Sequence, residues 1–310
     1  MATANPAGNV HQETVQQLFC SIGLPVGGQL TFILVLNSFV SIVACLGNAL
    51  ILIALRKESA LHPPSKLLLR CLATTDLCVG LISEPLFDTS CLSVMNEYWN
   101  ICRYAAAAGF TSASIFSGVS LLTMTAISLD RLLALLLGLK YRQVVTLKRT
   151  YMIVITFLVL CTVCSATWFW NPVINLWFGI IVTSLCLVTS VFSYTMIFFT
   201  LRHHQNQLQD HVQQPNQTNQ LNIARYKKAV STAICLQLAL VVCYVPYSVV
   251  TVFAPKSGRI SSVYYAGRCT FTLVFFNSSL NSILYCWKIG EVRQAVKDTI
   301  RKVLCHCFTS

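Results

Sequence analysis

Apolar segments long enough to cross a bilayer recur along nearly the whole chain, and this pattern leaves few folds open. Hydrophobic residues make up 55% of the 310 residues and charged residues only 10%, which lies well outside the composition of soluble domains. We place spans at residues 29–55, 67–90, 101–136 and 151–170, a fifth that ends near residue 201, and two more at 229–253 and 263–287. The sequence therefore predicts an all-α membrane protein, a seven-transmembrane helix bundle without a separate soluble domain.

The basic residues are distributed unevenly across these spans. Arg103, Lys256, Arg259 and Arg268 fall on one side of the predicted membrane, Arg131 lies at a span end, and all other Lys and Arg lie on the opposite side. Because cytoplasmic loops carry an excess of Lys and Arg, we expect the N-terminus outside the cell and the C-terminus in the cytoplasm. Membrane orientation thus accounts for the net charge of +12, and we expect no nucleic-acid partner.

We divide the chain into an extracellular tail (1–28), a membrane domain (29–287) and a cytoplasmic tail (288–310). The first part holds Glu13 but no Lys or Arg, so we do not expect a cleaved leader. The last part has apolar residues at helical spacing with bases between them, which predicts an amphipathic helix on the membrane surface. Those apolar residues are Ile289, Val292, Val296, Ile300 and Val303. Cys305 and Cys307 follow as candidates for lipidation, so membrane lipid is an expected partner.

The third span, extended to Arg142, is almost wholly apolar but carries the charged pair Asp130 and Arg131 near its end. A charge at the centre of a span costs about 2.5–3.5 kcal/mol and less near the ends, so the pair calls for an explanation. Adjacent helix residues point in different directions, so Asp130 cannot permanently satisfy Arg131. One hypothesis is a switch in which Arg131, held in low dielectric at the inner mouth, exchanges partners. The alternative is an interfacial charge cluster whose arginine reaches water.

Span two carries three carboxylates. Asp76 lies mid-membrane, Glu84 and Asp88 lie toward the outer end, and Pro85 is expected to kink the helix. Glu84 and Asp88 are four residues apart and so share a helix face. We expect at least one of them to line an outward cavity. In the alternative, Asp88 is interfacial and only Glu84 is buried.

Most of the fifteen cysteines fall within spans, where Cys behaves as a small apolar residue. Cys20, Cys91, Cys102 and Cys269 fall at or near the outer face and can oxidise there. Their pairing cannot be read from the sequence.

Three tryptophans, Trp168, Trp170 and Trp177, cluster where spans four and five meet. Their position favours an aromatic belt at the membrane interface over a cofactor site.

Taken in order, these residues resemble the rhodopsin-like (class A) G-protein-coupled receptors over nearly the whole chain. Each mark alone is weak, but each lies on the span where that family carries it. The matching residues are Gly47-Asn48, Leu72 to Asp76, Asp130-Arg131, Tyr194, Pro246, Asn281 and Tyr285, with the loop GLKYR after the third span. The second outer loop lacks the family's partner cysteine, which is similar to the melanocortin, adenosine, cannabinoid and lysophospholipid receptor cluster.

The resemblance implies a plasma-membrane receptor, not an enzyme, that transduces an extracellular ligand signal to a cytoplasmic heterotrimeric G protein. It places Arg131, Tyr194 and Tyr285 around a cytoplasmic cleft and gives Leu139 the role of inserting an apolar side chain into Gα. The other residues it assigns to the switch and coupling surface are Asp130, Asn281, Arg225, Lys227 and Lys228.

The residues that form the family's sodium pocket are also present, so the resemblance implies an allosteric Na⁺ and no other cofactor. Its residues here are Asp76, Ser120, Asn277, Ser278 and Asn281. A carboxylate with neutral oxygens suits a hard cation. The alternatives are that Asn48 and Asn281 alone satisfy Asp76, or that desolvation keeps it protonated.

For the ligand, the resemblance gives an outer pocket lined mostly by apolar and aromatic residues. They are Glu84, Asp88, Ala113, Ser117, Phe178, Tyr244, Tyr247, Phe271 and Phe275. Ala113 stands where the family's amine receptors carry aspartate, which disfavours a monoamine held in the usual way. Glu84 can pair with a cationic ligand or peptide, and the lining also suits a small molecule or lipid.

Several family residues are replaced. The proline of span seven is Ser282, whose hydroxyl can bend the helix by bonding back to a carbonyl. The usual Trp, Pro and Tyr of spans six, five and three are Tyr244, Cys186 and Leu132. No acidic residue lies among residues 222–229, so the span-six partner of the switch arginine is missing and we predict raised basal signalling.

A channel or secondary transporter is the main alternative function. Transporters usually show paired repeats with broken helices, and we find no internal repeat, while a channel would need an oligomeric ring. A retinal protein would need a lysine in span seven, and residues 263–287 contain none. The run Gly118 to Ser120 faintly resembles a membrane serine protease, but every His lies outside the spans, so Ser120 lacks a base.

Overall fold

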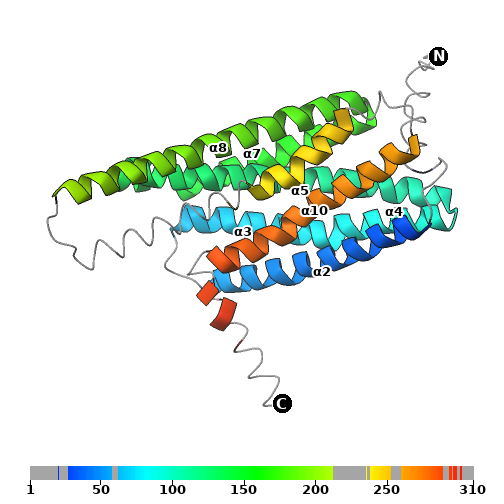
Figure 1. Ribbon diagram of the computed structural model, residues 1–310, viewed down its shortest axis with the longest axis horizontal. Coiled ribbons are helices and arrows are strands. Elements are labelled where there is room, and N and C mark those ends of the chain that lie inside the picture. Colours follow the sequence, from blue (N-terminus) through cyan, green and yellow to red (C-terminus); the bar gives the residue numbers. More distant parts are fainter. Residues whose placement is uncertain are drawn as a thin grey trace.

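The computed structural model describes residues 20, 27–57, 62–211, 235, 238–252, 260–288, 293–294, 296–298 and 301, and every long element among them is a helix. These elements are α2 (Gly27–Lys57), α3 (Pro63–Cys78), α4 (Glu84–Met95), α5 (Trp99–Leu137), α7 (Leu147–Ala166), α8 (Pro172–His211), α10 (Ile260–Lys288) and the helical segment 238–252. With α3 and α4 joined end to end, they form seven rods in one bundle (Figure 1). The predicted seven-helix membrane fold is confirmed.

Among the residues that the structure describes, four segments are long and apolar enough to cross a membrane by length and composition. They cover Gly28–Arg56, Trp99–Val144, Leu147–Phe169 and Val173–Thr200, and a shorter apolar helix covers Leu238–Val252. Taken separately, α3 and α4 are short, with 16 and 12 residues. Both the α3–α4 rod and α10 carry polar side chains that the bundle buries away from lipid.

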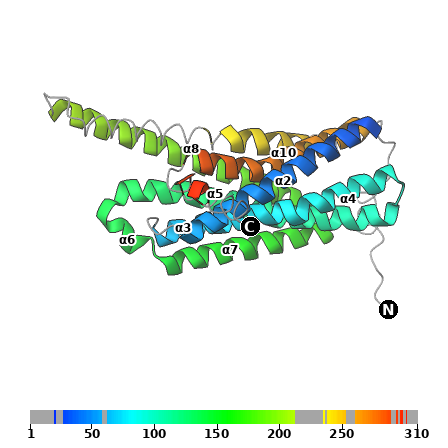
Figure 2. The ribbon, with the colours of Figure 1, turned by 90° about the horizontal axis from the view of Figure 1, so that it is seen from below.

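The rods pack around α5, which contacts α3, α4, α7 and α8. In its most apolar window 56% of the α5 span is buried, against 11% for α7 and 17% for α8. The side chains of α7 and α8 therefore face mostly outward, toward lipid. α2 packs against α3, α4 and α10, and α7 lies on the far side of the bundle from α10 (Figure 2).

Span two is interrupted by one π-helical turn, Val79–Ser83, which joins α3 to α4. Pro85 lies two residues beyond this turn and has no N–H to donate, so the backbone there cannot keep its regular hydrogen bonds. The carbonyl of Gly80 instead accepts a hydrogen bond from Ser41 Oγ at 2.8 Å. The irregularity predicted at Pro85 thus takes the form of a π turn.

The approach of α2 to α10 depends on Gly47. A Cβ at this position would lie 2.8 Å from Ser282 Cβ and closer still to Ser282 Oγ. Ser282 Oγ donates to the carbonyl of Ser279 at 2.8 Å, which is the predicted back-bond of the residue that replaces the family proline. The two helices therefore pack closely only because position 47 has no side chain.

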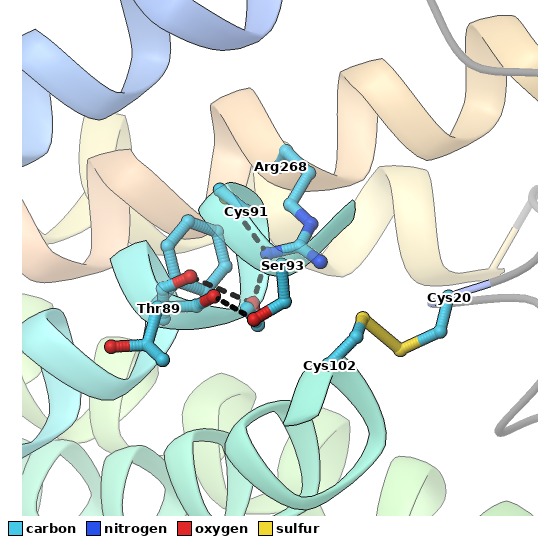
Figure 3. The surroundings of a disulfide bond; sticks show 8 residues. Cys20, Thr89, Cys91, Ser93, Cys102 and Arg268 are labelled. Atoms are coloured by element: carbon cyan, nitrogen blue, oxygen red, sulfur yellow. Dashed lines mark hydrogen bonds between the residues drawn. A yellow bond between two sulfur atoms is a disulfide. The ribbon is translucent and has the colours of Figure 1, made fainter. Parts of the chain in front are cut away.

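One disulfide, between Cys20 and Cys102, joins the N-terminal tail to the start of α5 (Figure 3). Cys91 and Cys269 carry free thiols. Among the four outer cysteines the structure thus selects one pairing that the sequence left open.

Beyond α10 the description is partial. Val296 is buried against the bundle core, whereas Arg293, Gln294, Lys297 and Asp298 are exposed. This agrees with the predicted amphipathic character. Cys305 and Cys307 lie outside the described residues, so their lipidation stays a prediction.

Candidate functional site

The carboxylate of Asp130 is buried near the C-terminal end of α5 and accepts hydrogen bonds from two hydroxyl groups. It accepts hydrogen bonds from Ser65 Oγ at 2.7 Å and from Tyr141 Oη at 2.6 Å. The Tyr141 ring, in α6 (Tyr141–Val144), packs on His62 with 5.2 Å between centroids. As expected, Arg131 is not the partner of Asp130. The Asp130 carboxylate instead joins the loop after α5 to α3 through these two hydrogen bonds.

Arg131 itself is exposed. Its guanidinium makes no hydrogen bond or ion pair within the described ranges, although it lies within electrostatic reach of Tyr141 and Tyr194. The prediction that this side chain sits in low dielectric is wrong, because a long arginine near a helix end extends to water. Its placement matches the interfacial alternative, and it leaves the guanidinium accessible to a docking partner.

Leu139 is 98% exposed in the short turn Gly138–Lys140. Gly138 begins this turn with φ +50°, a conformation that glycine adopts without strain. A single exposed leucine is normal on a protein surface, so the assignment of Leu139 to an interface rests on the family resemblance. Tyr194 is half-buried on α8. Arg225, Lys227, Lys228 and the side chain of Tyr285 lie outside the described residues.

Asp76, the carboxylate of the predicted sodium site, is fully buried, and two of the other predicted residues bond to it. Its carboxylate accepts from Ser120 Oγ at 2.7 Å and from Asn281 Nδ2 at 2.9 Å. The Oδ1 atoms of Asn277 and Asn281 are buried without a hydrogen-bond donor in the described chain. The alternative in which Asn48 satisfies Asp76 is wrong, because Asn48 Nδ2 donates to the backbone of Ala44 and Ser278 instead.

Glu84 and Asp88 have different surroundings in α4. Glu84 is fully buried, and neither of its carboxyl oxygens has a hydrogen-bond partner within the described chain. Asp88 is half-buried and accepts from Asn37 Nδ2 and Ser38 Oγ, each at 3.2 Å. Asp88 is therefore satisfied by α2, while the Glu84 carboxyl has no hydrogen-bond partner among the described residues.

Phe271 on α10 is the hub of an aromatic cluster. Its ring lies 4.9 Å from Phe275, 5.4 Å from Phe87, 5.5 Å from Tyr247 and 6.2 Å from Phe110. Three of these residues belong to the predicted ligand set, whereas Phe87 and Phe110 were missed. The position of Phe87 three residues after Glu84 was the available signal, since such residues share a helix face.

Other predicted ligand residues lie at the edge of this cluster or apart from it. Ala113 is buried in the same apolar core as Phe275. Tyr244 Oη donates to the carbonyl of Ser117 at 3.5 Å, and Ser117 Oγ is buried without a partner in the described chain. Phe178 is half-buried on α8, and no ring contact joins it to the cluster within the described residues.

The three tryptophans differ in their exposure and contacts. Trp170 and Trp177 are 81% and 56% exposed, as expected for interface anchors. Trp168 instead packs on Phe110 at 4.2 Å between ring centroids, which extends the aromatic cluster to the end of α7.

Arg268 on α10 was predicted only as an outer-side base, yet it is 97% buried (3% exposed). Its Nη1 donates to Ser90 Oγ at 2.8 Å and Cys91 Sγ at 3.1 Å, and the guanidinium lies 4.5 Å from the Phe87 ring centroid. Figure 3 shows it at the disulfide end of the bundle. Arg268 thus links α10 to α4 next to the aromatic cluster, through its contact with Phe87.

Comparison with known proteins places these features in a family context. Residues 47–171 match the model of the 7 transmembrane receptor (rhodopsin family). The chain is 23% identical to mouse (Mus musculus) melanocortin receptor 5 over 86% of its length and 82% of that protein. It is 30% identical to the rat (Rattus norvegicus) muscarinic acetylcholine receptor M3 over 49% of its length, but spans only 25% of that receptor. Its fold matches the crystal structure of squid rhodopsin with a TM-score of 0.73 at 17% identity, covering 92% of this chain and 89% of that one.

Proposed function

We propose that this chain is a rhodopsin-like (class A) G-protein-coupled receptor, and that it couples a ligand bound in the outer half of the bundle to a heterotrimeric G protein at the opposite end. The observation that carries the proposal is the cytoplasmic end of α5. There a fastened Asp130 holds a loop that presents Leu139, beside an exposed Arg131. In this proposal the N-terminus lies outside the plasma membrane and residues 288–310 lie in the cytoplasm, as the distribution of basic residues favours.

The ligand-facing end combines the aromatic cluster around Phe271 with the unpartnered carboxyl of Glu84. We infer a small-molecule, lipid or peptide ligand with an apolar body and a hydrogen-bond donor for Glu84. The small side chain of Ala113 disfavours a monoamine held from α5. Similarity to a melanocortin receptor over most of the chain supports, as a proposal, the melanocortin, adenosine, cannabinoid and lysophospholipid cluster.

An allosteric Na⁺ fits the site around Asp76. The bundle buries one carboxylate, the Ser120 hydroxyl and two amide oxygens without donors, which is a donor set that a hard cation prefers. Asp76, Ser120, Asn277, Ser278 and Asn281 would hold the ion. Its charge would stabilise an ionised Asp76 in the bundle interior.

Basal activity is part of the proposal. The switch arginine makes no ion pair within the described chain, and the sequence offers no acidic residue at 222–229 to restrain it. A receptor without that restraint is expected to release GDP from its G protein in the absence of agonist.

The experiment is GDP release in a reconstituted system. The purified full chain in lipid nanodiscs is mixed with heterotrimers carrying chimeric Gα subunits, without ligand, and exchange is compared with that in empty nanodiscs. We expect faster exchange with at least one Gα class. No acceleration with any class would contradict the basal-activity proposal, and ligand-independent ion flux through the same protein in liposomes would favour the channel or transporter alternative instead.

A further inference from the structure

A carboxyl and a guanidinium group lie along one face of α4 in the outer half of the bundle. Glu84 is fully buried, and Phe87 and Cys91 follow it by three and seven residues, so the three share a helix face. The guanidinium of Arg268, on α10, lies 4.5 Å from the Phe87 ring centroid and beside Cys91 (Figure 3). We call Glu84 and Arg268 the outer charge pair.

The two members of the outer charge pair are separated along α4. Arg268 Nη1 donates to Cys91 Sγ at 3.1 Å, and Cys91 lies about 10 Å along the helix axis from Glu84. Both carboxyl oxygens of Glu84 are buried without a hydrogen-bond partner in the described chain, so the two side chains do not bond to each other. Each member can therefore receive a separate group of a bound molecule.

The side chains around Phe87, between the two charged groups, are aromatic. The Phe87 ring lies 5.4 Å from the ring of Phe271 and 5.5 Å from that of Phe275. Tyr247 in turn lies 5.5 Å from Phe271. A molecule bound along this face would contact aromatic rings at its middle and a charged side chain at each end.

The chemistry of the pair favours a ligand that carries both an acid and an amine. A guanidinium presents its N–H donors in a planar fork that matches a carboxylate, and a ligand ammonium would supply the donors that Glu84 lacks in the described chain. A ligand with only an acid would leave Glu84 unsatisfied, and one with only an amine would bring a second positive charge near Arg268. The neighbouring acid, Asp88, already accepts hydrogen bonds from Asn37 and Ser38 of α2.

We propose that the outer half of the bundle binds a small zwitterion with an aromatic or apolar middle, whose carboxylate pairs with Arg268 and whose ammonium pairs with Glu84. This inference rests on the proposed ligand-binding function and names the class of ligand. An extended chain spans at most about 3.3–3.6 Å per residue, so a separation of about 10 Å corresponds to a peptide of roughly three residues with free termini. Each charged hydrogen-bonded contact contributes about 10- to 150-fold in affinity.

The test is calorimetric titration of the purified full chain in lipid nanodiscs with tripeptides. The probes are Gly-Phe-Gly with free termini, its N-acetyl form, its C-terminal amide and Gly-Gly-Gly. We expect the free Gly-Phe-Gly to bind most tightly. Blocking either terminus should weaken binding at least about tenfold through the lost charged contact. Gly-Gly-Gly should also bind at least about tenfold more weakly, because it cannot bury an aromatic side chain against the cluster.

Two variants assign the termini to the members of the pair. Arg268→Gln should bind the acid and the amide equally and still prefer the free amine, whereas Glu84→Gln should lose only the preference for the free amine. The matched controls are Arg103→Gln and Glu97→Gln, which remove the same charges from exposed outer residues and should keep both preferences. If either variant of the pair fails to fold, the comparison of free and blocked peptides on the native chain decides alone.

Three outcomes would overturn the proposal. They are no saturable binding of Gly-Phe-Gly to the native chain, equal affinity for its free and blocked forms, and an Arg268→Gln variant that still distinguishes acid from amide. The coupling function fails by a different result. Peptide binding without GDP exchange on any Gα class would contradict coupling alone, whereas GDP exchange without peptide binding would contradict the zwitterion alone.

Discussion

Removing the Tyr141 hydroxyl tests whether Asp130 holds the loop after α5 against α3. The change Tyr141→Phe deletes the 2.6 Å hydrogen bond to the buried carboxylate and leaves the ring packed on His62. Hydrogen bonds to charged groups contribute about 1.5–3 kcal/mol, and a buried acceptor that loses its donor costs at least as much. At about 2–4 °C for each kcal/mol, the midpoint of thermal unfolding should fall by on the order of 5 °C.

The assay is unfolding of the purified chain in detergent, followed by tryptophan fluorescence. Tyr104→Phe is the matched control, because Tyr104 is 73% exposed and makes no hydrogen bond within the described chain. Ser65→Ala removes the other donor to Asp130 and should lower the midpoint similarly. The effects of Tyr141→Phe and Ser65→Ala should not add, because both act on one carboxylate. If Tyr141→Phe unfolded at the same temperature as Tyr104→Phe, Asp130 would not be the anchor of the loop.

Three further predictions address the bundle interior. Gly47→Ala should destabilise the fold by about 1–3 kcal/mol through overpacking against Ser282, and Ser282→Gly in the same chain should recover most of that loss in thermal unfolding. Replacing N-methylglucamine by Na⁺, at a Na⁺ concentration tenfold above its Kd, should raise the free energy of unfolding of the native chain by about 1.4 kcal/mol. Asp76→Asn should abolish this rise. A sodium effect that persists in the variant would exclude the site. Glu84→Met should stabilise the ligand-free chain by about 1–3 kcal/mol, because it removes a buried carboxyl without a hydrogen-bond partner in the described chain. A lower melting temperature of the variant would show that Glu84 has a partner.

Hydrophobicity predicted the positions of the spans well, because the length of a bilayer fixes how long an apolar helix must be. The sequence could not predict that the partners of Asp130 are hydroxyls, since Ser65 lies 65 residues away and meets it only through the packing of α3 on α5. The sequence left open whether Arg131 is buried or exposed, because the neighbouring helices decide whether an arginine at a span end is covered.

Around the carboxylates of span two, the sequence likewise predicted some features and not others. The sequence identified the carboxylates of span two and several of the aromatic residues, since both stand out in an apolar helix. It did not reveal that Asp88 is satisfied by α2 while Glu84 is not, or that Arg268 is buried against Phe87. These outcomes depend on how α4 is rotated by the π turn at Val79–Ser83, and that turn has only a proline as its signal.

The exchange of GDP on a heterotrimeric G protein by the Arg131→Gln variant tests the central claim most directly. Variant and native chain are reconstituted at matched amounts, with equal thermal stability confirmed beforehand, and exchange is followed with every Gα class that the native chain activates. Our account predicts that exchange falls to the rate of empty nanodiscs for all of them. Exchange at the native rate would contradict the view that this end of α5 is where the receptor acts on its G protein.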